Sequence, residues 1–331
     1  MTPDGLACWA SGGSGGAQAL LADRPDGMVV RCGELVAKAH APDSDAPALA
    51  ARLRIAGAAP LAGILLPPLR TGRLRGRHVS LWPYGTPVDP DRPEDAPWEA
   101  AARLLAALHR TPPEALPGPV PPMRGPAKVA RSLRRLARAL TGPPPGVPGA
   151  DARCAGSAAC IGCVPSNGDP DVLAVRAAGL TLPAWARGEA AAPPGGALCH
   201  GDLHLGQLVR HPAPEGPWLL IDVDDLGLGT PAWDLARPAA WYAAGLLPPE
   251  EWLRFLDAYR AAGGPAAGPP GCDPWPELDL AARALTVQTA ALALAKAAEA
   301  GRRLDDGERL MVDACVRIAM LPADLESGAP S

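Results

Sequence analysis

Two acidic residues and a carboxamide are spaced along one stretch of the chain as a phosphoryl-transfer site requires. Asp202 precedes Gln207 by five positions, and Asp222 ends an apolar, strand-like segment, Trp-Leu-Leu-Ile at 218–221. In phosphoryl transfer, one carboxylate orients the attacking hydroxyl and accepts its proton, while an amide and a second carboxylate hold the metal on the nucleotide phosphates. The oxygen ligands that Mg²⁺ prefers are therefore present at a suitable spacing.

Three segments of this region together resemble the aminoglycoside phosphotransferase (APH) superfamily of small-molecule kinases. They are His-Gly-Asp-Leu-His-Leu-Gly-Gln at 200–207, Leu-Ile-Asp-Val-Asp-Asp at 220–225 and Asp-Leu-Ala at 234–236. The first segment, with Gln in place of the usual Asn, is also similar to the maltokinases. Maltokinases usually carry Phe-Glu-Gly after the metal-binding Asp, whereas this chain has Val-Asp-Asp at 223–225.

The resemblance implies a function and a role for each matching residue. It implies ATP or GTP as phosphoryl donor, Mg²⁺ as cofactor and a hydroxyl of a small molecule as acceptor. Asp202 would be the catalytic residue, with Gln207 and Asp222 as metal ligands, and His200 and Asp234 would support the catalytic loop. Asp224 and Asp225 are interpreted as solvated loop carboxylates, with a supplementary metal role left open.

The resemblance also implies an α+β, protein-kinase-like fold with two lobes, and the residue patterns agree with it. The first 80 residues predict mostly short strands, including a tight hairpin of 28–31 with 35–38. Further strands are expected at 64–66 and 78–82, and a helix from Pro47 to Gly57. We expect a nucleotide-binding lobe over 1–85, with a hinge at 81–85, and a helical catalytic and substrate lobe over 86–331.

The C-terminal part is predicted to be helical apart from one long loop. Helices are expected at 99–110, 128–141, 249–262, 277–300 and 306–320. Residues 142–150 are rich in Pro and Gly and predict a loop that continues to about Leu180, as a substrate-contacting lid or as an unstructured insertion. Within it, Cys154, Cys160 and Cys163 lack a clean fourth ligand and are expected to be reduced thiols rather than a zinc site.

Lys38 is the candidate for binding the nucleotide phosphates. It stands in a Val-Ala-Lys strand similar to the kinase lysine motif, and lysine is otherwise found only at 128 and 296. Gly13 and Gly15, in the Gly-rich run before it, are candidate backbone donors to phosphate or part of a flexible linker.

The adenine would by resemblance contact the hinge around Leu81, Trp82 and Tyr84. One departure concerns the helix that follows Lys38. Kinase-like enzymes pair this lysine with a helix Glu, but residues 47–57 contain no acid. Asp43 or Asp45 is a possible substitute, unless the lysine is held in another way.

Composition restricts the partners. A net charge of −4 gives no indication of a nucleic-acid surface, and no secretory signal follows Met1. The apolar run from Ala284 to Ala295 contains polar residues and is shorter than a membrane span. A cytoplasmic monomer without membrane or nucleic-acid partners is expected, with its eight cysteines reduced.

Three other functions remain open from the sequence. A catalytically degenerate kinase fold that binds nucleotide or a metabolite is favoured by the missing helix Glu and the Gln207 substitution, and opposed by the intact Asp202 and Asp222. A maltokinase-like sugar kinase is favoured by the Leu-Gly-Gln wording. A metallohydrolase built on His200, His204 and Asp222 is disfavoured, because Gly201 stands where a zinc-protease helix needs Glu.

Overall fold

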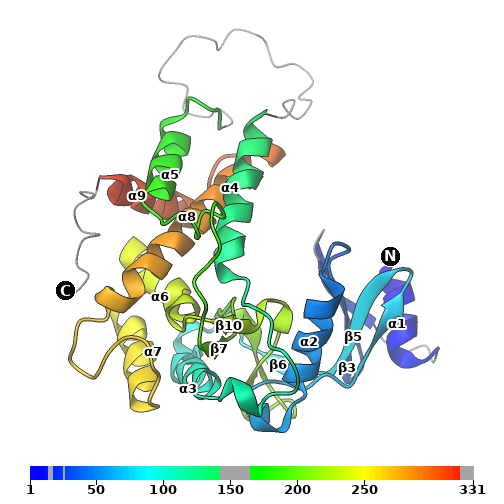
Figure 1. Cartoon of the computed structure of the whole chain (residues 1–331). Coiled ribbons are helices and arrows are strands. Elements are labelled where there is room, and N and C mark those ends of the chain that lie inside the picture. The colour runs from blue at the N-terminus through cyan, green and yellow to red at the C-terminus, as the bar shows by residue number, and fades with distance from the viewer. Residues whose placement is uncertain (14–17, 25–26, 142–164, 321–331) are drawn as a thin grey trace. The chain divides into compact units, whose positions relative to one another are not determined.

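The computed structural model describes residues 1–13, 18–24, 27–141 and 165–320 (Figure 1). The chain forms two compact units. The first comprises Met1–Met123, Gly195–Asp234 and Arg254–Gly271, and the second comprises Arg124–Pro194, Leu235–Leu253 and Cys272–Ser331. The lobe boundary expected at residues 81–85 stays a prediction.

The first unit is built on a five-stranded antiparallel sheet, in the order β1-β2-β3-β5-β4. The strands are β1 (Gln18–Arg24), β2 (Gly27–Cys32), β3 (Leu35–Ala39), β4 (Arg70–Leu74) and β5 (Arg77–Pro83). The predicted hairpin of β2 with β3 is confirmed. Val30, Ala37 and Val79 are buried on one face of the sheet, in a cluster with residues of α1 (Pro3–Ser11).

One local prediction in this region was wrong, and one helix was missed. Residues 64–66 do not form a strand. They follow a short 3₁₀ helix, Leu65 forms an isolated parallel bridge with Leu220, and Leu65 and Leu66 are buried outside the five-stranded sheet. The strand lies instead at β4, whose sequence Arg-Thr-Gly-Arg-Leu is exposed and carries no apolar alternation. Helix α1 was not predicted, although Thr2 caps it and Gly12 ends it in a left-handed conformation.

The first unit also contains helices and several short strands that carry or flank the candidate site residues. Helix α2 (Ala46–Ala56) begins at the N-cap Asp45, close to the predicted start, and α3 (Trp98–His109) is also as predicted. The remaining strands form two small antiparallel sheets. One pairs β7 (Ala197–Cys199) with β10 (Gly227–Gly229), and the other has the order β6 (Thr86–Pro87), β8 (Leu208–Arg210), β9 (Trp218–Leu220).

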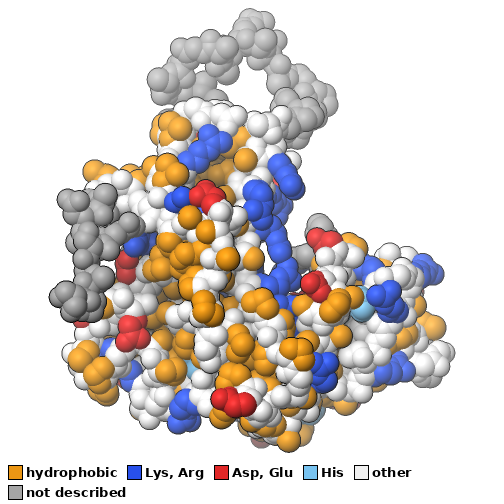
Figure 2. Space-filling view, viewed as in Figure 1, with side chains coloured by type: hydrophobic (Ala, Val, Ile, Leu, Met, Phe, Trp, Pro, Cys, Tyr) orange, Lys and Arg blue, Asp and Glu red, His pale blue; other side chains and the backbone are white. Residues whose placement is uncertain are grey.

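The second unit is helical. Its helix α8 (Trp275–Ala300) is apolar around its circumference and packs against α4 (Gly125–Thr141), α5 (Pro170–Leu180) and α9 (Asp306–Ala319). Helices α6 (Ala232–Ala244) and α7 (Pro249–Ala261) each contribute residues to both units. The exposed face of α4 is basic, and Figure 2 shows Lys and Arg side chains gathered along it.

Helix α5 corrects the prediction of a loop reaching Leu180, since the chain is helical from Pro170. The N-cap Asp169 followed by Pro170 is a start signal that the Pro-rich surroundings obscured. The predicted loop at 142–150 and the cysteines at 154, 160 and 163 lie outside the described residues.

Helix α8 is long and apolar enough, by length and composition, to cross a membrane, and 67% of its apolar window is buried inside the structure. It is longer than the apolar run from Ala284 to Ala295 because it begins at Trp275. Burial of this kind is typical of the central helix of a helical core, since neighbouring helices cover its apolar surface.

Candidate active site

The two small sheets determine where the candidate residues lie. We name residues 200–207 the HGD loop and residues 222–226 the DVDD loop. Strand β7 leads into the HGD loop and pairs with β10, which follows the DVDD loop, with Cys199 opposite Gly227. Strand β8 follows the HGD loop and pairs with β9, which precedes the DVDD loop, with Leu208 opposite Leu220. Both loops are therefore held side by side at each end.

This pairing brings the carboxamide of Gln207 to the carboxylate of Asp222. Gln207 Nε2 lies 3.5 Å from Asp222 Oδ2, and the Ile221 N–H donates to the Gln207 carbonyl at 2.9 Å. Rotating the amide by half a turn exchanges its nitrogen and oxygen, which would direct two oxygen ligands toward one cation. Both predicted metal ligands are thus close enough to share an ion.

Asp234 holds the start of the HGD loop. One oxygen accepts from the backbone N–H of His200 at 2.6 Å and the other from that of Gly201 at 2.7 Å. The buried His109 donates through Nε2 to Asp234 at 3.0 Å, and its Nδ1 lies 2.8 Å from Tyr259 Oη. Burial would raise the pKa of Asp234, but these hydrogen bonds and neighbouring histidines lower it below its ordinary value.

The buried side chain of His200 connects the HGD loop to the residue before the DVDD loop. Its side chain is fully buried, and Nε2 donates to the Ile221 carbonyl at 2.8 Å, directly before Asp222. The neighbouring Gly201 has a φ of 83°. A Cβ at this position would lie 2.5 Å from the backbone oxygen of Asp225, so only glycine fits between the loops. Asp202, half-buried, follows this contact directly.

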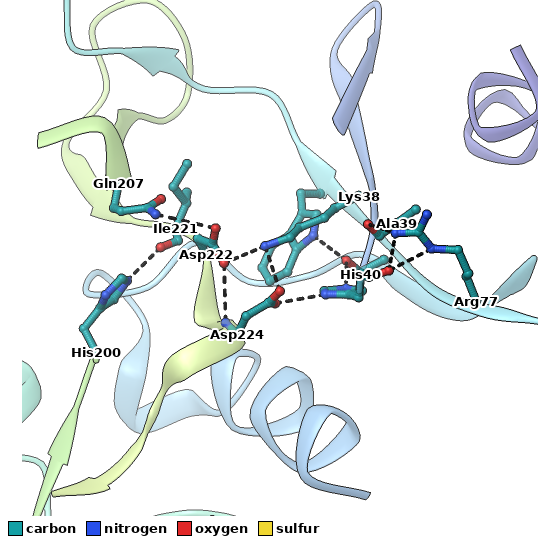
Figure 3. A network of polar contacts seen from close by, with 11 residues as sticks. Lys38, Ala39, His40, Arg77, His200, Gln207, Ile221, Asp222 and Asp224 are labelled. Atoms are coloured by element: carbon teal, nitrogen blue, oxygen red, sulfur yellow. Dashed lines mark hydrogen bonds and ion pairs between the residues drawn. The ribbon is translucent and has the colours of Figure 1, made fainter. Parts of the chain in front are cut away.

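Asp222 has a left-handed backbone with a φ of 62°. Asp tolerates this conformation better than most residues, and backbone strain of this kind occurs at functional sites. Its side chain is in direct contact with Lys38, whose Nζ donates to Asp222 Oδ1 at 2.6 Å (Figure 3). Asp222 therefore contacts both the predicted phosphate-binding lysine and the predicted amide ligand.

Lys38 has a second carboxylate partner, Asp224, whose Oδ2 is 3.0 Å from Nζ. Burial alone would lower the pKa of Lys38, but Asp222 and Asp224 raise it above its ordinary value. Burial would likewise raise the pKa of Asp224, yet Lys38 and His40 lower it. The interpretation of Asp224 as a solvated loop carboxylate was wrong, since it is an ion-pair partner of Lys38.

The acid missing from α2 is thus not supplied by the preceding loop. Asp45 instead caps α2, accepting from the Ala48 N–H at 3.0 Å. What α2 contributes is a buried guanidinium: Arg52 donates to the carbonyl of Leu226 at 2.7 Å and to that of Pro122 at 3.0 Å. Arg52 fixes the end of the DVDD loop. Its signal in the sequence was a charged residue among the buried residues of an apolar helix.

Besides Lys38, the sequence predicted nucleotide contacts by hinge residues and by the Gly-rich run. Leu81 and Trp82 are buried in β5. The Tyr84 N–H donates to the Glu34 carbonyl at 2.8 Å and its carbonyl accepts from His211 Nδ1 at 3.0 Å, so its backbone is already bonded within the chain. Gly13 follows the end of α1, and Gly15 lies outside the described residues. Base and phosphate contacts by these residues stay predictions.

Other histidine and cysteine side chains that could bind a metal have structural roles or are protonated. His204 Nδ1 accepts from the Gly206 N–H at 3.1 Å and caps a turn. In the part of the chain that is described, His109, Cys199 and Asp234 form a buried group of possible metal ligands. Burial and the charge of Asp234 raise the pKa of Cys199 well above its ordinary value, which disfavours the thiolate a metal needs.

Trp241 and Tyr242, two aromatic residues of α6, lie in the second unit. Tyr242 stacks on Trp252 with ring centroids 5.5 Å apart and on Trp275 at 6.4 Å. Trp241 is half-buried, with the Arg237 guanidinium 5.9 Å from its ring. Tyr242 therefore belongs to a packed aromatic group.

The sequence profile of the phosphotransferase enzyme family, APH, matches residues 25–275. That span covers most of the chain and includes every residue of both loops. The chain belongs to this family. A comparison with curated protein sequences found no match.

Solved structures show that this APH-family chain has a protein-kinase-like α+β fold. A ternary complex of a thermostable mutant of aminoglycoside phosphotransferase APH(4)-Ia with AMP-PNP and hygromycin B is 14% identical, with a TM-score of 0.59 over 100% of both chains. A choline/ethanolamine kinase family protein from Mesorhizobium loti is 17% identical, with a TM-score of 0.56 over 97% of this chain and 94% of that one. Choline kinase LicA from Streptococcus pneumoniae is 14% identical, with a TM-score of 0.51 over 92% of each chain.

Proposed function

We propose that this APH-family chain transfers the γ-phosphoryl group of ATP or GTP to a hydroxyl of a small molecule. The observation that carries the proposal is the position of Asp222, which contacts Lys38 at 2.6 Å and lies 3.5 Å from the amide of Gln207. A carboxylate that touches both a phosphate-binding lysine and an amide is where nucleotide phosphates and their metal would meet.

Each residue has a distinct task in the proposed reaction. Asp202 accepts a hydrogen bond from the acceptor hydroxyl, orients it toward the γ-phosphorus and takes its proton. Lys38 binds the α- and β-phosphates through its ammonium group. Asp222 and Gln207 would hold Mg²⁺, which when bound neutralises charge on the β- and γ-phosphate oxygens. His200 and Asp234 keep the HGD loop in place, so that Asp202 needs no rearrangement before transfer.

The donor and acceptor are supported by relatives of the same fold. The APH(4)-Ia complex holds AMP-PNP, an ATP analogue, beside hygromycin B, and other neighbours are choline and ethanolamine kinases. These support a nucleotide donor and a hydroxyl-bearing small molecule, while sequences this distant share a fold without sharing a substrate. A sugar acceptor, as in maltokinases, rests on the Leu-Gly-Gln segment alone.

The alternative of a degenerate, non-catalytic fold loses part of its motivation. It rested partly on the missing helix Glu and partly on Gln207, yet Lys38 has two carboxylate partners, Asp222 and Asp224. The lysine is therefore charged and positioned without an acid on α2.

A screen of acceptors tests the proposed reaction. The purified chain is incubated with Mg²⁺ and either ATP or GTP, together with pooled sugars, aminoglycosides, macrolides or amino alcohols. We expect one pool to raise nucleotide consumption and to yield a product with one added phosphoryl group by mass spectrometry. Magnesium-dependent nucleotide binding without turnover on any pool would favour the non-catalytic alternative.

Substitutions of Gln207 test its role as a metal ligand. Gln207→Leu removes the ligand oxygen, and we expect kcat/KM for the nucleotide to fall at least about tenfold, the smallest typical cost of disturbing even an indirect partner of a metal. Gln207→Asn restores the family's usual carboxamide and should retain most activity. Gln288→Leu, which removes a buried glutamine of α8, is the matched control. Equal rates for Gln207→Leu and the control would exclude Gln207 as a ligand.

A further inference from the structure

His40 lies in the network around Lys38, although the sequence patterns gave it no role. It follows Lys38 by two residues, directly after the end of β3, and both side chains reach Asp224. Its imidazole is fully buried. Nδ1 is 2.9 Å from Asp224 Oδ1, and Nε2 is 2.8 Å from Ser80 Oγ. Figure 3 shows Lys38 and this imidazole both facing the carboxylate of Asp224.

Hydrogen bonds of β5 hold the other ring nitrogen of His40. Trp82 Nε1 lies 2.8 Å from Ser80 Oγ, and an indole N–H can only donate, so Ser80 accepts from Trp82. The Ser80 hydroxyl proton is then available to His40 Nε2. Nδ1 lies 2.9 Å from Asp224 Oδ1, and a proton on Nδ1 avoids placing its lone pair against that oxygen.

The backbone of His40 is also held from β5. Arg77 donates to the His40 carbonyl through Nη2 at 2.6 Å and through Nε at 2.9 Å. In the sheet register, Lys38 lies opposite Ser80. The imidazole is therefore fixed at its backbone and at Nε2, and Nδ1 and Asp224 Oδ1 have no other polar partner among the described residues. His40 limits where the Asp224 carboxylate can lie.

We propose that the His40–Asp224 pair takes the place of the glutamate that kinase-like enzymes carry on the helix after the lysine. The inference rests on the proposed function. Asp222 offers Oδ1 to Lys38 and Oδ2 toward Gln207, and a metal bound there would take up much of the charge of this carboxylate. With Asp224 held by His40, Lys38 keeps an acidic partner when Asp222 binds the metal. His40 is thus a positioning residue that acts on Lys38 through Asp224.

Two amide substitutions separate positioning from simple packing. His40→Asn places an amide nitrogen near the position of Nδ1, whereas His40→Gln places one near that of Nε2. We expect the affinity for Mg²⁺·AMP-PNP, measured by calorimetry on the full chain, to stay near wild type in His40→Asn. It should fall about tenfold in His40→Gln, as for loss of an indirect partner of a metal site.

Further variants and a stability measurement keep the test decisive. Asp224→Asn leaves His40 intact and should weaken Mg²⁺·AMP-PNP as much as His40→Gln does. His78→Asn is the matched control, since His78 lies on β5 and bonds Arg73 at 3.1 Å instead of a carboxylate. Thermal unfolding of each variant identifies any loss of affinity that comes from loss of the fold.

The outcomes are distinct. Weak binding by His40→Gln and Asp224→Asn, with rescue in His40→Asn, supports the proposal. Equal weakening by both amides, or wild-type affinity in Asp224→Asn, overturns it and leaves His40 as a packing residue. If the wild-type chain does not bind Mg²⁺·AMP-PNP at all, the proposed function itself fails.

Discussion

Asp202→Asn should reduce kcat for phosphoryl transfer by about a thousandfold, within the range measured for removing a general base. Asn keeps the size and hydrogen-bonding capacity of the side chain but cannot accept the proton of the acceptor hydroxyl. The affinity for Mg²⁺·AMP-PNP should stay close to wild type, because Lys38, Gln207 and Asp222 are unchanged. The measurement is steady-state turnover on the acceptor found by screening, with nucleotide binding followed by calorimetry.

A matched acid provides the control for this variant. Asp257→Asn removes one negative charge from the exposed face of α7 and should leave kcat unchanged. A kcat for Asp202→Asn within a few-fold of this control would remove Asp202 from the reaction. Loss of nucleotide binding together with kcat would instead assign Asp202 to the metal site.

Asp234→Asn should lower the free energy of unfolding by about 3 kcal/mol or more, because hydrogen bonds to a buried charged group are worth about 1.5–3 kcal/mol each. The wild-type carboxylate accepts from two backbone N–H groups and from His109, all of them buried or part-buried. An Asn amide can offer only one oxygen to these donors and brings its own N–H₂ against another. Urea unfolding at neutral pH measures the loss, with Asp257→Asn as the control.

The same variant has a characteristic pH dependence. The pKa of Asp234 is lower in the folded chain than the ordinary value of 3.8. The ionised carboxylate therefore stabilises the fold fully above that value, and the contribution is lost as the pH falls through the folded-state pKa. The difference in unfolding free energy between wild type and Asp234→Asn should shrink in acid. A difference that is constant from neutral to acidic pH would show that the charge of Asp234 is not its source.

The parts of the fold that the sequence predicted are those governed by neighbouring residues. The β2–β3 hairpin follows from apolar runs flanking Gly33, and α2 begins and ends close to its predicted Pro and Gly signals. The failures have a common cause. Residues 64–66 are apolar because of tertiary burial, and the exposed strand β4 has no apolar side to reveal it.

In the candidate site, too, some features follow from neighbouring residues and others depend on residues far apart in the sequence. The closeness of Gln207 to Asp222 could be predicted, because both residues lie in motifs that resemble the APH family. The ion pair of Lys38 with Asp222 joins residues 184 positions apart, and the contact of His40 with Asp224 depends on the same juxtaposition. Arg52 reaches the Leu226 carbonyl from a helix 174 positions away. No local pattern encodes these pairings, because they arise only when the sheet meets the DVDD loop.

Calorimetry of AMP-PNP binding with and without Mg²⁺, on the wild-type chain and on Asp222→Asn, tests the central claim most directly. The claim is that Asp222 and Gln207 bind the metal that carries the nucleotide phosphates beside Lys38. We predict that Mg²⁺ strengthens binding to the wild type and that this gain largely disappears in Asp222→Asn. A variant that keeps the full magnesium-dependent gain would contradict the claim.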